Sequence, residues 1–159
     1  MELQETAAGG YAAVYKHSDT GAFWFLCYAT SAAQGGGYQL LIRLPLPTTA
    51  QLIDIALQSA HEDETVAAVF RLLDEEALEK KEFRQSLVEK LEQQLLLPQD
   101  APARKRMGQV IKLTELDSPL NRREVLRKTQ TEIAQDAADF TAIANRATRV
   151  LEKIRPSRQ

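Results

Sequence analysis

Histidines and carboxylates are the side chains with which acid–base or metal chemistry would begin in this sequence, and it has only two histidines. His17 comes just before a turn, and His61 is followed directly by Glu62, Asp63 and Glu64. A histidine beside carboxylates offers ligands that a divalent metal accepts. Four consecutive residues do not have the spacing of a known metal site. We therefore expect this stretch to form the N-terminus of a helix, where acidic residues interact favourably with the helix dipole.

Three further carboxylates, those of Glu132, Asp136 and Asp139, fall within two turns of one helical face. Such a set can chelate a cation, but a solvated stripe is the commoner arrangement. A di-iron bundle site would need Glu-x-x-His pairs, and none accompanies them. The sequence also has neither Gly-x-Ser-x-Gly nor His-Glu-x-x-His. We therefore expect no catalytic centre, no metal site and no cofactor.

Three consecutive glycines, Gly35 to Gly37, have the composition of a phosphate-binding loop. Phosphate loops lead from a strand into the N-terminus of a helix. These glycines instead lie between two predicted strands, so we expect a flexible hairpin loop.

Charge is divided unevenly along the chain. Residues 61–100 contain 11 acidic and 5 basic residues, and residues 101–159 contain 7 acidic and 13 basic residues, so their net charges are −6 and +6. Either the two charged surfaces face each other or solvent, or one of them steers a partner of opposite charge. The second alternative predicts a partner-binding surface at His61, Glu62, Asp63, Glu64, Asp74, Glu75 and Glu76.

Basic residues gather in two clusters, 104–106 and 122–128. Nucleic-acid binding would need such clusters. The chain is acidic overall, however, and its aromatic residues lie mostly far away in the predicted sheet. We expect these clusters to form salt bridges with the acidic segment 74–82, and we do not expect a nucleic-acid partner.

The amino-terminal third has the pattern of three strands, at residues 11–17, 23–28 and 38–44. The first alternates in polarity, the second is rich in aromatic residues, and the third places its apolar residues on one face. Residues 18–21 have turn chemistry. These features predict an antiparallel meander. Its middle strand is apolar on both faces, so we expect helices or another protein to cover Trp24, Leu26 and Tyr28.

A helical pattern begins after Pro47. Thr48 and Gln51 have the spacing of a capping box, and Asp63 is a candidate cap for the second helix. Residues 75–82 are predicted to form a polar connection or a solvated extension of that helix. Two further helices follow at about residues 83–95 and 103–116, the second weakened by Gly108.

The stretch from Ser118 to Arg155 contains one proline, at its first turn, and no glycine. An unbroken helix of that length would be about 55 Å long. A compact chain of this size is roughly 40 Å across, so one end of the helix would extend beyond the body and offer a bare face to a partner. Thr129 and Glu132 also have capping-box spacing, so the alternative is a helix that begins again there.

Apolar residues in the final stretch recur at steps of four and three, which is the pattern of a heptad seam. The seam packs either on the chain's own helices or on a partner, a homodimer included. Its residues are Ile133, Ala137, Phe140, Ala144, Ala147, Leu151 and Ile154.

The chain of 159 residues is long enough for a single domain with its own core, residues 1–47 forming the meander and 48–159 the helical part. Residues 1–10 lack the pattern of a secretory signal, and the longest apolar run, 22–29, is far shorter than the ~20 residues of a membrane span. Cys27 is alone, so we expect no disulfide and no thiolate zinc site. These features predict a cytoplasmic protein without a membrane partner.

Two stretches of the sequence resemble a known class of protein. Residues 11–44 form a predicted hairpin with Asp19-Thr20-Gly21 at its tip, and residues 52–95 include the segments 56–59, 67–73 and 83–91. Together they are similar to small bacterial immunity proteins that neutralise a co-encoded polymorphic toxin. The resemblance covers at most half of the chain and transfers no site residues, because such proteins vary most where they bind. It implies a cytoplasmic, non-catalytic protein that blocks a toxin by occlusion.

The expected fold is α+β, with an N-terminal three-stranded antiparallel meander packed against four to five helices, the last of them long. The expected function is protein binding without catalysis, first as an immunity protein whose charged surface covers a toxin's active site. The alternative is a chaperone or assembly adaptor of a secretion or other multiprotein system, which binds through a sheet edge or the C-terminal helix. A third alternative is a small enzyme or ligand-binding domain that uses a cleft between sheet and helices, with Tyr15, Cys27, Tyr28 and Tyr38 as its candidate residues.

Overall fold

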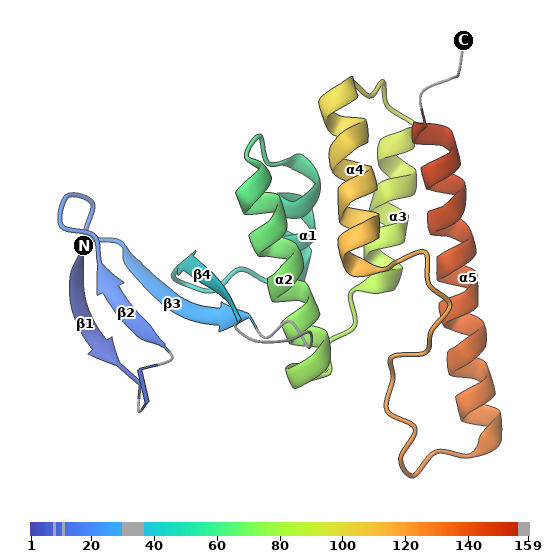
Figure 1. Cartoon of the computed structure of the whole chain (residues 1–159), viewed down its shortest axis with the longest axis horizontal. Helices are drawn as coiled ribbons and strands as arrows, with labels where there is room; N and C mark the ends of the chain where they lie inside the picture. The colour runs from blue at the N-terminus through green and yellow to red at the C-terminus, as the bar shows by residue number, and fades with distance from the viewer. Residues whose placement is uncertain (8, 11, 30–36, 156–159) are drawn as a thin grey trace.

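The chain folds into an antiparallel sheet followed by five helices, and the computed structural model describes residues 1–7, 9–10, 12–29 and 37–155 (Figure 1). This is the expected α+β class. The elements are β1 (Glu2–Thr6), β2 (Ala13–Lys16), β3 (Phe23–Ala29), β4 (Tyr38–Arg43), α1 (Thr49–Gln58), α2 (Glu62–Glu79), α3 (Arg84–Leu95), α4 (Ala101–Thr114) and α5 (Gln130–Ile154).

The sheet has the strand order β1-β2-β3-β4, and each strand is antiparallel to its neighbour. Strands β2, β3 and β4 are the three predicted ones. The expectation of three strands is nevertheless wrong, because β1 adds a fourth. All residues of β1 are exposed, so this strand lacks the alternation of apolar residues that marks a half-buried strand. The predicted loop at Gly35 and Gly36 lies outside the described residues.

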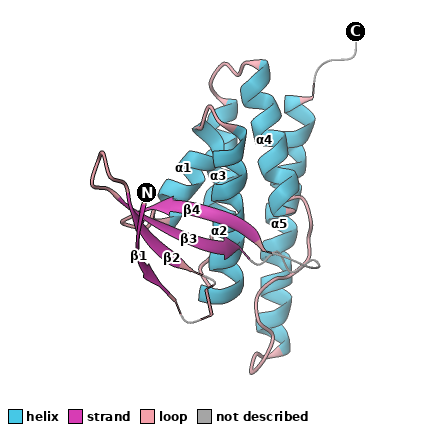
Figure 2. Cartoon of the chain, turned by 60° about the vertical axis from the view of Figure 1, so that its left-hand side comes forward, coloured by secondary structure: helices cyan, strands magenta, loops and turns pink. Residues whose placement is uncertain are grey.

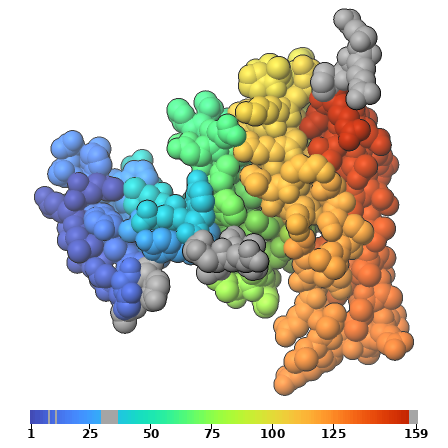
Figure 3. Space-filling view, in the orientation of Figure 1, coloured from blue at the N-terminus to red at the C-terminus, as the bar shows by residue number. Residues whose placement is uncertain are grey.

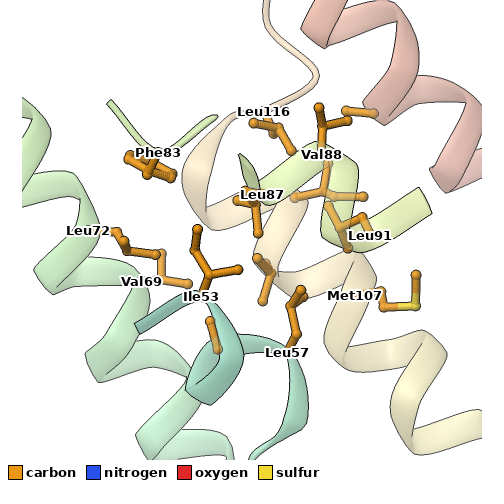
Figure 4. Packing of buried hydrophobic residues seen from close by; sticks show 14 of the residues in the cluster. Ile53, Leu57, Val69, Leu72, Phe83, Leu87, Val88, Leu91, Met107 and Leu116 are labelled. Carbon is orange, nitrogen blue, oxygen red and sulfur yellow. The ribbon is translucent and has the colours of Figure 1, made fainter. Parts of the chain in front are cut away.

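The main cluster of buried hydrophobic residues lies among the helices (Figure 4). Ala13, Ala29 and Leu40 of the sheet are buried outside this cluster. All five helices contribute to it, and the side chains from α1, α2, α3 and α4 interlock at its centre. The sheet forms a lobe that projects from this helical body (Figure 3). The largest fully buried core side chains are Phe83, Leu72, Leu87, Leu91, Met107, Ile111 and Leu116.

The final helix begins at Gln130, so the prediction of an unbroken helix from Ser118 is wrong. The Thr129 side chain accepts a hydrogen bond from the backbone N–H of Glu132, and the Glu132 carboxylate accepts one of 2.7 Å from the backbone N–H of Thr129. This capping box starts α5 afresh. With 25 residues α5 is about 37 Å long, and residues 115–129 form a loop beside its first half (Figure 1).

The apolar face of α5 packs on α3 and α4 of the same chain. Of the predicted seam residues, Phe140, Ala144, Ala147 and Ile154 are buried, and the other three are half-buried. The buried face also contains Ile143 and Val150, because a straight helix repeats every 3.6 residues and drifts away from a strict heptad.

Helix α2 differs from its prediction at its N-terminus. His61, and not Asp63, is the N-cap residue, and it makes no side-chain capping bond. At the other end the helix continues to Glu79, which agrees with the alternative of a helical extension, although Glu75 is buried and not solvated. Lys80 then ends it in the left-handed conformation, with φ of 56°. None of the described helices is both long and apolar enough to cross a membrane.

Candidate protein-binding site

One face of the sheet packs on α2. In the strand register Cys27 lies opposite Leu40 and Ala29 lies opposite Tyr38, so all four side chains share this face. Leu40 is 2% exposed, and the Tyr38 ring stacks on Phe70 of α2 with 4.9 Å between the ring centroids. Burial raises the pKa of the Cys27 thiol. The helices thus cover the face of Cys27 and Ala29, and not the face of Trp24, Leu26 and Tyr28, for which a cover was expected.

The opposite face of the sheet has no helix on it in the described part of the chain, because all five helices lie on the α2 side (Figures 1 and 2). Three cross-strand rows build this face. They are Leu3–Tyr15–Trp24–Arg43, Thr6–Ala13–Leu26–Leu41 and Tyr28–Gln39. We call its six large apolar residues the open sheet face: Leu3, Tyr15, Trp24, Leu26, Tyr28 and Leu41.

Much of the open sheet face is in contact with solvent. Leu3 is 56% exposed, Leu41 44% and Tyr28 43%, while the side chains between them are half-buried by their neighbours. The Tyr28 hydroxyl accepts a hydrogen bond of 3.1 Å from the Gln39 amide, which fixes one corner. A contiguous apolar patch rimmed by polar residues is typical of a surface that binds another macromolecule.

The Trp24 side chain adds a polar group to this face. Its indole Nε1 is shielded from solvent, and among the described residues it has no hydrogen-bond acceptor. A shielded N–H without an acceptor costs about 1–3 kcal/mol. Trp24 lies between Tyr15 and Arg43 in its cross-strand row.

The edges of the sheet differ from each other. β1 carries Glu2 and Glu5 and has a register shift between Leu3 and Glu5, and both features discourage pairing with another strand. β4 is the other edge, and no described strand pairs with its outer side. It has no such irregularity in its register.

The seven acidic-stretch residues predicted as a binding surface do not form one surface. His61, Glu62, Asp63 and Glu64 are exposed in and before the first turn of α2. The segment 74–76 begins ten residues later, about 15 Å along the helix axis. There Asp74 and Glu75 are 6% and 2% exposed, so they are part of the interior.

The two parts of that stretch also have different contacts. Glu75 accepts a hydrogen bond of 2.8 Å from Thr49 and lies 3.6 Å from Arg71, and Glu76 accepts two hydrogen bonds from the buried Arg84. At the helix start, Glu62 lies 3.5 Å from Lys105. The acidic residues of segment 74–76 thus stabilise the helical body.

The basic clusters pair with several acidic segments. Arg123 donates to Glu82, as the predicted pairing with segment 74–82 requires. Arg122 pairs instead with Glu115, outside that segment. In the other cluster, Arg106 donates to two backbone carbonyls at the end of α1.

The three carboxylates on α5 are engaged by the chain itself. Arg123 donates hydrogen bonds of 2.8 Å to both Asp136 and Asp139. Hydrogen bonds from Lys128 and then from Arg123 hold the pKa of Asp136 below its usual value. Glu132 is part of the cap. Among the described residues, no group of three His, Cys, Asp or Glu side chains is placed to hold a metal ion.

The four residues of the enzyme alternative do not converge. Tyr38 and Cys27 lie on the face that packs on α2, whereas Tyr15 and Tyr28 lie on the open sheet face. The sequence pattern placed these residues in strands, but only the register decides on which face each side chain lies.

Comparison with protein-family models, with curated proteins and with solved structures found no match to this chain.

Proposed function

We propose that this chain binds another protein through the open sheet face and does not itself catalyse a reaction. The observation that carries the proposal is the row of large apolar side chains on a sheet face with no described helix. Tyrosine and tryptophan, both present here, are enriched at the centres of protein interfaces. Arg43 and Gln39, at the ends of two rows, supply polar contacts beside them.

The helical body supports this proposal because it does not need the open sheet face. Its main cluster of buried hydrophobic residues contains no residue of the open sheet face. A sheet with one solvated face ordinarily places polar residues on that face. Leu26 and Leu41 lie opposite each other there instead, which is an unfavourable arrangement in water that a partner would correct.

The first candidate for this function is an immunity protein that blocks a toxin by covering it. A sheet whose strands are all paired presents a rigid surface, and rigidity lowers the entropic cost of binding. The resemblance in segments 11–44 and 52–95 also supports this candidate. The second candidate is an assembly adaptor, which the regular outer edge of β4 supports because it can accept an added strand.

The experiment is photo-crosslinking in the native host, with a photoreactive residue at position 41 and a matched one at the exposed position 141 on α5. We expect a protein adduct at position 41 and none at 141. With the purified partner, Leu26→Ser and Leu41→Ser should each weaken binding by about tenfold or more, whereas Thr141→Ser should not. Equal crosslinking at both positions, or unchanged affinity in both sheet variants, would contradict the proposal.

The two candidates differ in what the partner does. Expression of the partner alone should arrest growth if the chain is an immunity protein, and co-expression of the wild type, but not of Leu41→Ser, should restore growth. An adaptor should instead lose the assembly of its complex when Leu41 is replaced, with no effect of the partner on growth.

A further inference from the structure

A groove of about 660 Å³ lies at the end of the helical body where α3 ends and α5 ends. The groove is lined by the end of α3, the connection between α3 and α4, the start of α4 and the last turns of α5. These ends lie near one another in Figure 1. Val150 and Ile154 line its buried side, and Leu95 is half-buried beside them. The groove is distant in sequence from the open sheet face and shares no residue with it.

Two large apolar side chains stand at the rim of this groove. Leu96 is 85% exposed and Leu97 is 64% exposed, although both directly follow the last turn of α3. A single exposed leucine needs no explanation, but two consecutive ones at the rim of a groove, next to the half-buried Leu95, form a small apolar patch. This surface suits the apolar side of an incoming segment.

The charges in the groove are mostly positive. Its lining holds four basic residues and two acidic ones. Arg146 is neutralised by Glu92, to which it donates hydrogen bonds of 2.7 and 2.9 Å. In the described part of the chain no carboxylate lies within ion-pair distance of the other three, which are Arg104, Arg149 and Lys153.

The basic side chains without an ion pair face the same region of the groove. The pKa of Glu92 is held below its usual value chiefly by Arg146, and the charges of Arg149 and Lys153 lower it further. Arg149 and Lys153 are four residues apart on α5, so they project from the same side one turn apart. Arg104 stands across the groove, in the first turns of α4.

We infer that this groove binds an acidic amphipathic helix of another protein. A helix fits better than a strand because the groove lies between helices and offers no strand edge. Its leucine-like residues would contact Leu95, Leu96 and Leu97. Two of its carboxylates, one turn apart, would match the spacing of Arg149 and Lys153, and the positive field would speed the encounter.

The test uses a labelled synthetic peptide of roughly four helical turns, with leucines at i, i+3, i+4 and i+7 and glutamates on either side of them. Two control peptides have the same composition in scrambled order, or lysine in place of every glutamate. Fluorescence anisotropy with the full chain should detect binding of the first peptide. The affinity should fall by about tenfold or more between roughly 50 and 300 mM salt, and the control peptides should bind more weakly.

Variants of the full chain separate the two parts of the groove. Arg149→Glu with Lys153→Glu should weaken peptide binding by at least about tenfold, and so should Leu96→Ser with Leu97→Ser. All four residues are exposed, so circular dichroism melting should stay the same. Leu41→Ser on the open sheet face should leave peptide binding unchanged, so this test fails or succeeds independently of the proposed function.

Three results would overturn the inference. The scrambled peptide could bind as tightly as the amphipathic one, or either double variant could retain full affinity. A glutamate peptide without leucines, a single-stranded RNA or an anionic lipid vesicle could also displace the labelled peptide at equal charge concentration. That last result would mean that the groove attracts anions in general and does not recognise a helix.

Discussion

The guanidinium of Arg123 donates a hydrogen bond of 2.8 Å to the carboxylate of Asp136, and this bond joins the loop 115–129 to α5. The same guanidinium donates to Glu82, which lies between α2 and α3, and its carbon lies 5.6 Å from the ring centroid of Phe140. One side chain therefore connects the loop to two separate parts of the helical body. The capping box at the start of α5 fixes the far end of this loop.

Replacing Arg123 by methionine should loosen the loop. The aliphatic length is kept, but the hydrogen bonds to Asp136 and Glu82 are lost. We expect backbone amides of residues 118–128 to exchange with deuterium about tenfold faster, while amides of α3 and α4 keep their protection. Arg127→Met, at an exposed position of the same loop without an ion pair among the described residues, is the control and should have no such effect. Identical exchange in both variants would mean that Arg123 does not hold the loop.

Low pH should weaken the contact between Arg123 and Asp136. The pKa of Asp136 is lower in the folded chain than its ordinary value of about 3.9, because Lys128 and Arg123 bind the charged form. Its stabilising contribution is therefore complete above about pH 4 and is lost as pH falls through the folded pKa. Urea unfolding of the wild type between about pH 5 and 2 should show a steeper loss of stability than that of Asp136→Asn.

The comparison between the wild type and Asp136→Asn removes one carboxylate, whose charge also raises the pKa of Glu132 and of Asp139. Glu92, Glu132 and Asp139 also have lowered pKa values and lose stability in acid, but they are present in both proteins. If stability falls equally steeply with pH in both proteins, the basic partners of Asp136 do not stabilise its charged form in the folded chain.

The sequence could reveal those features of the fold that depend on residues close together in the chain. The capping boxes at Thr48 and Thr129 depend on residues three positions apart, and both are present. β1 could not be predicted in this way, because only its pairing with β2 makes it a strand. From the sequence Glu75 appeared to be a solvated residue, but it is buried. Thr49, which is distant in sequence, and Arg71, which is one helical turn away, satisfy its carboxylate.

The candidate binding surfaces required the tertiary structure. The apolar content of β3 was evident from the sequence, but the helices cover the face of Cys27 and Ala29 and leave that of Trp24, Leu26 and Tyr28 open. The register was needed to separate Tyr38 from Tyr28. The groove between α3 and α5 combines Leu96 and Arg149, which are more than fifty residues apart, and no local pattern connects them.

Substitutions in the helical core and on the open sheet face should lower the free energy of unfolding by different amounts. Leu72 is fully buried, so Leu72→Ala should lower the free energy of unfolding by about 2–5 kcal/mol. Leu41 is 44% exposed on the open sheet face, so Leu41→Ala should cost less than about 1 kcal/mol. Urea denaturation of both variants measures the difference. An equal cost would mean that the open sheet face is part of the stabilising core.

Removal of the cap that starts α5 should destabilise the helix. Thr129→Ala removes the hydroxyl that accepts from Glu132, and we expect a loss of about 1 kcal/mol. Thr131→Ala, at an exposed position two residues later, is the matched control and should be neutral or slightly stabilising, since alanine favours the helix. A neutral Thr129→Ala would show that packing alone determines where α5 begins.

The separation of the sheet from the helical core has a consequence for how such a chain changes over generations. Selection for folding acts mainly on the interlocked helices, where most substitutions leave a cavity or a strained side chain. If the open sheet face binds the partner, as proposed, selection for recognition acts on residues outside that core. New partners could then be acquired by exchanging a few strand residues, while the helical scaffold is inherited unaltered.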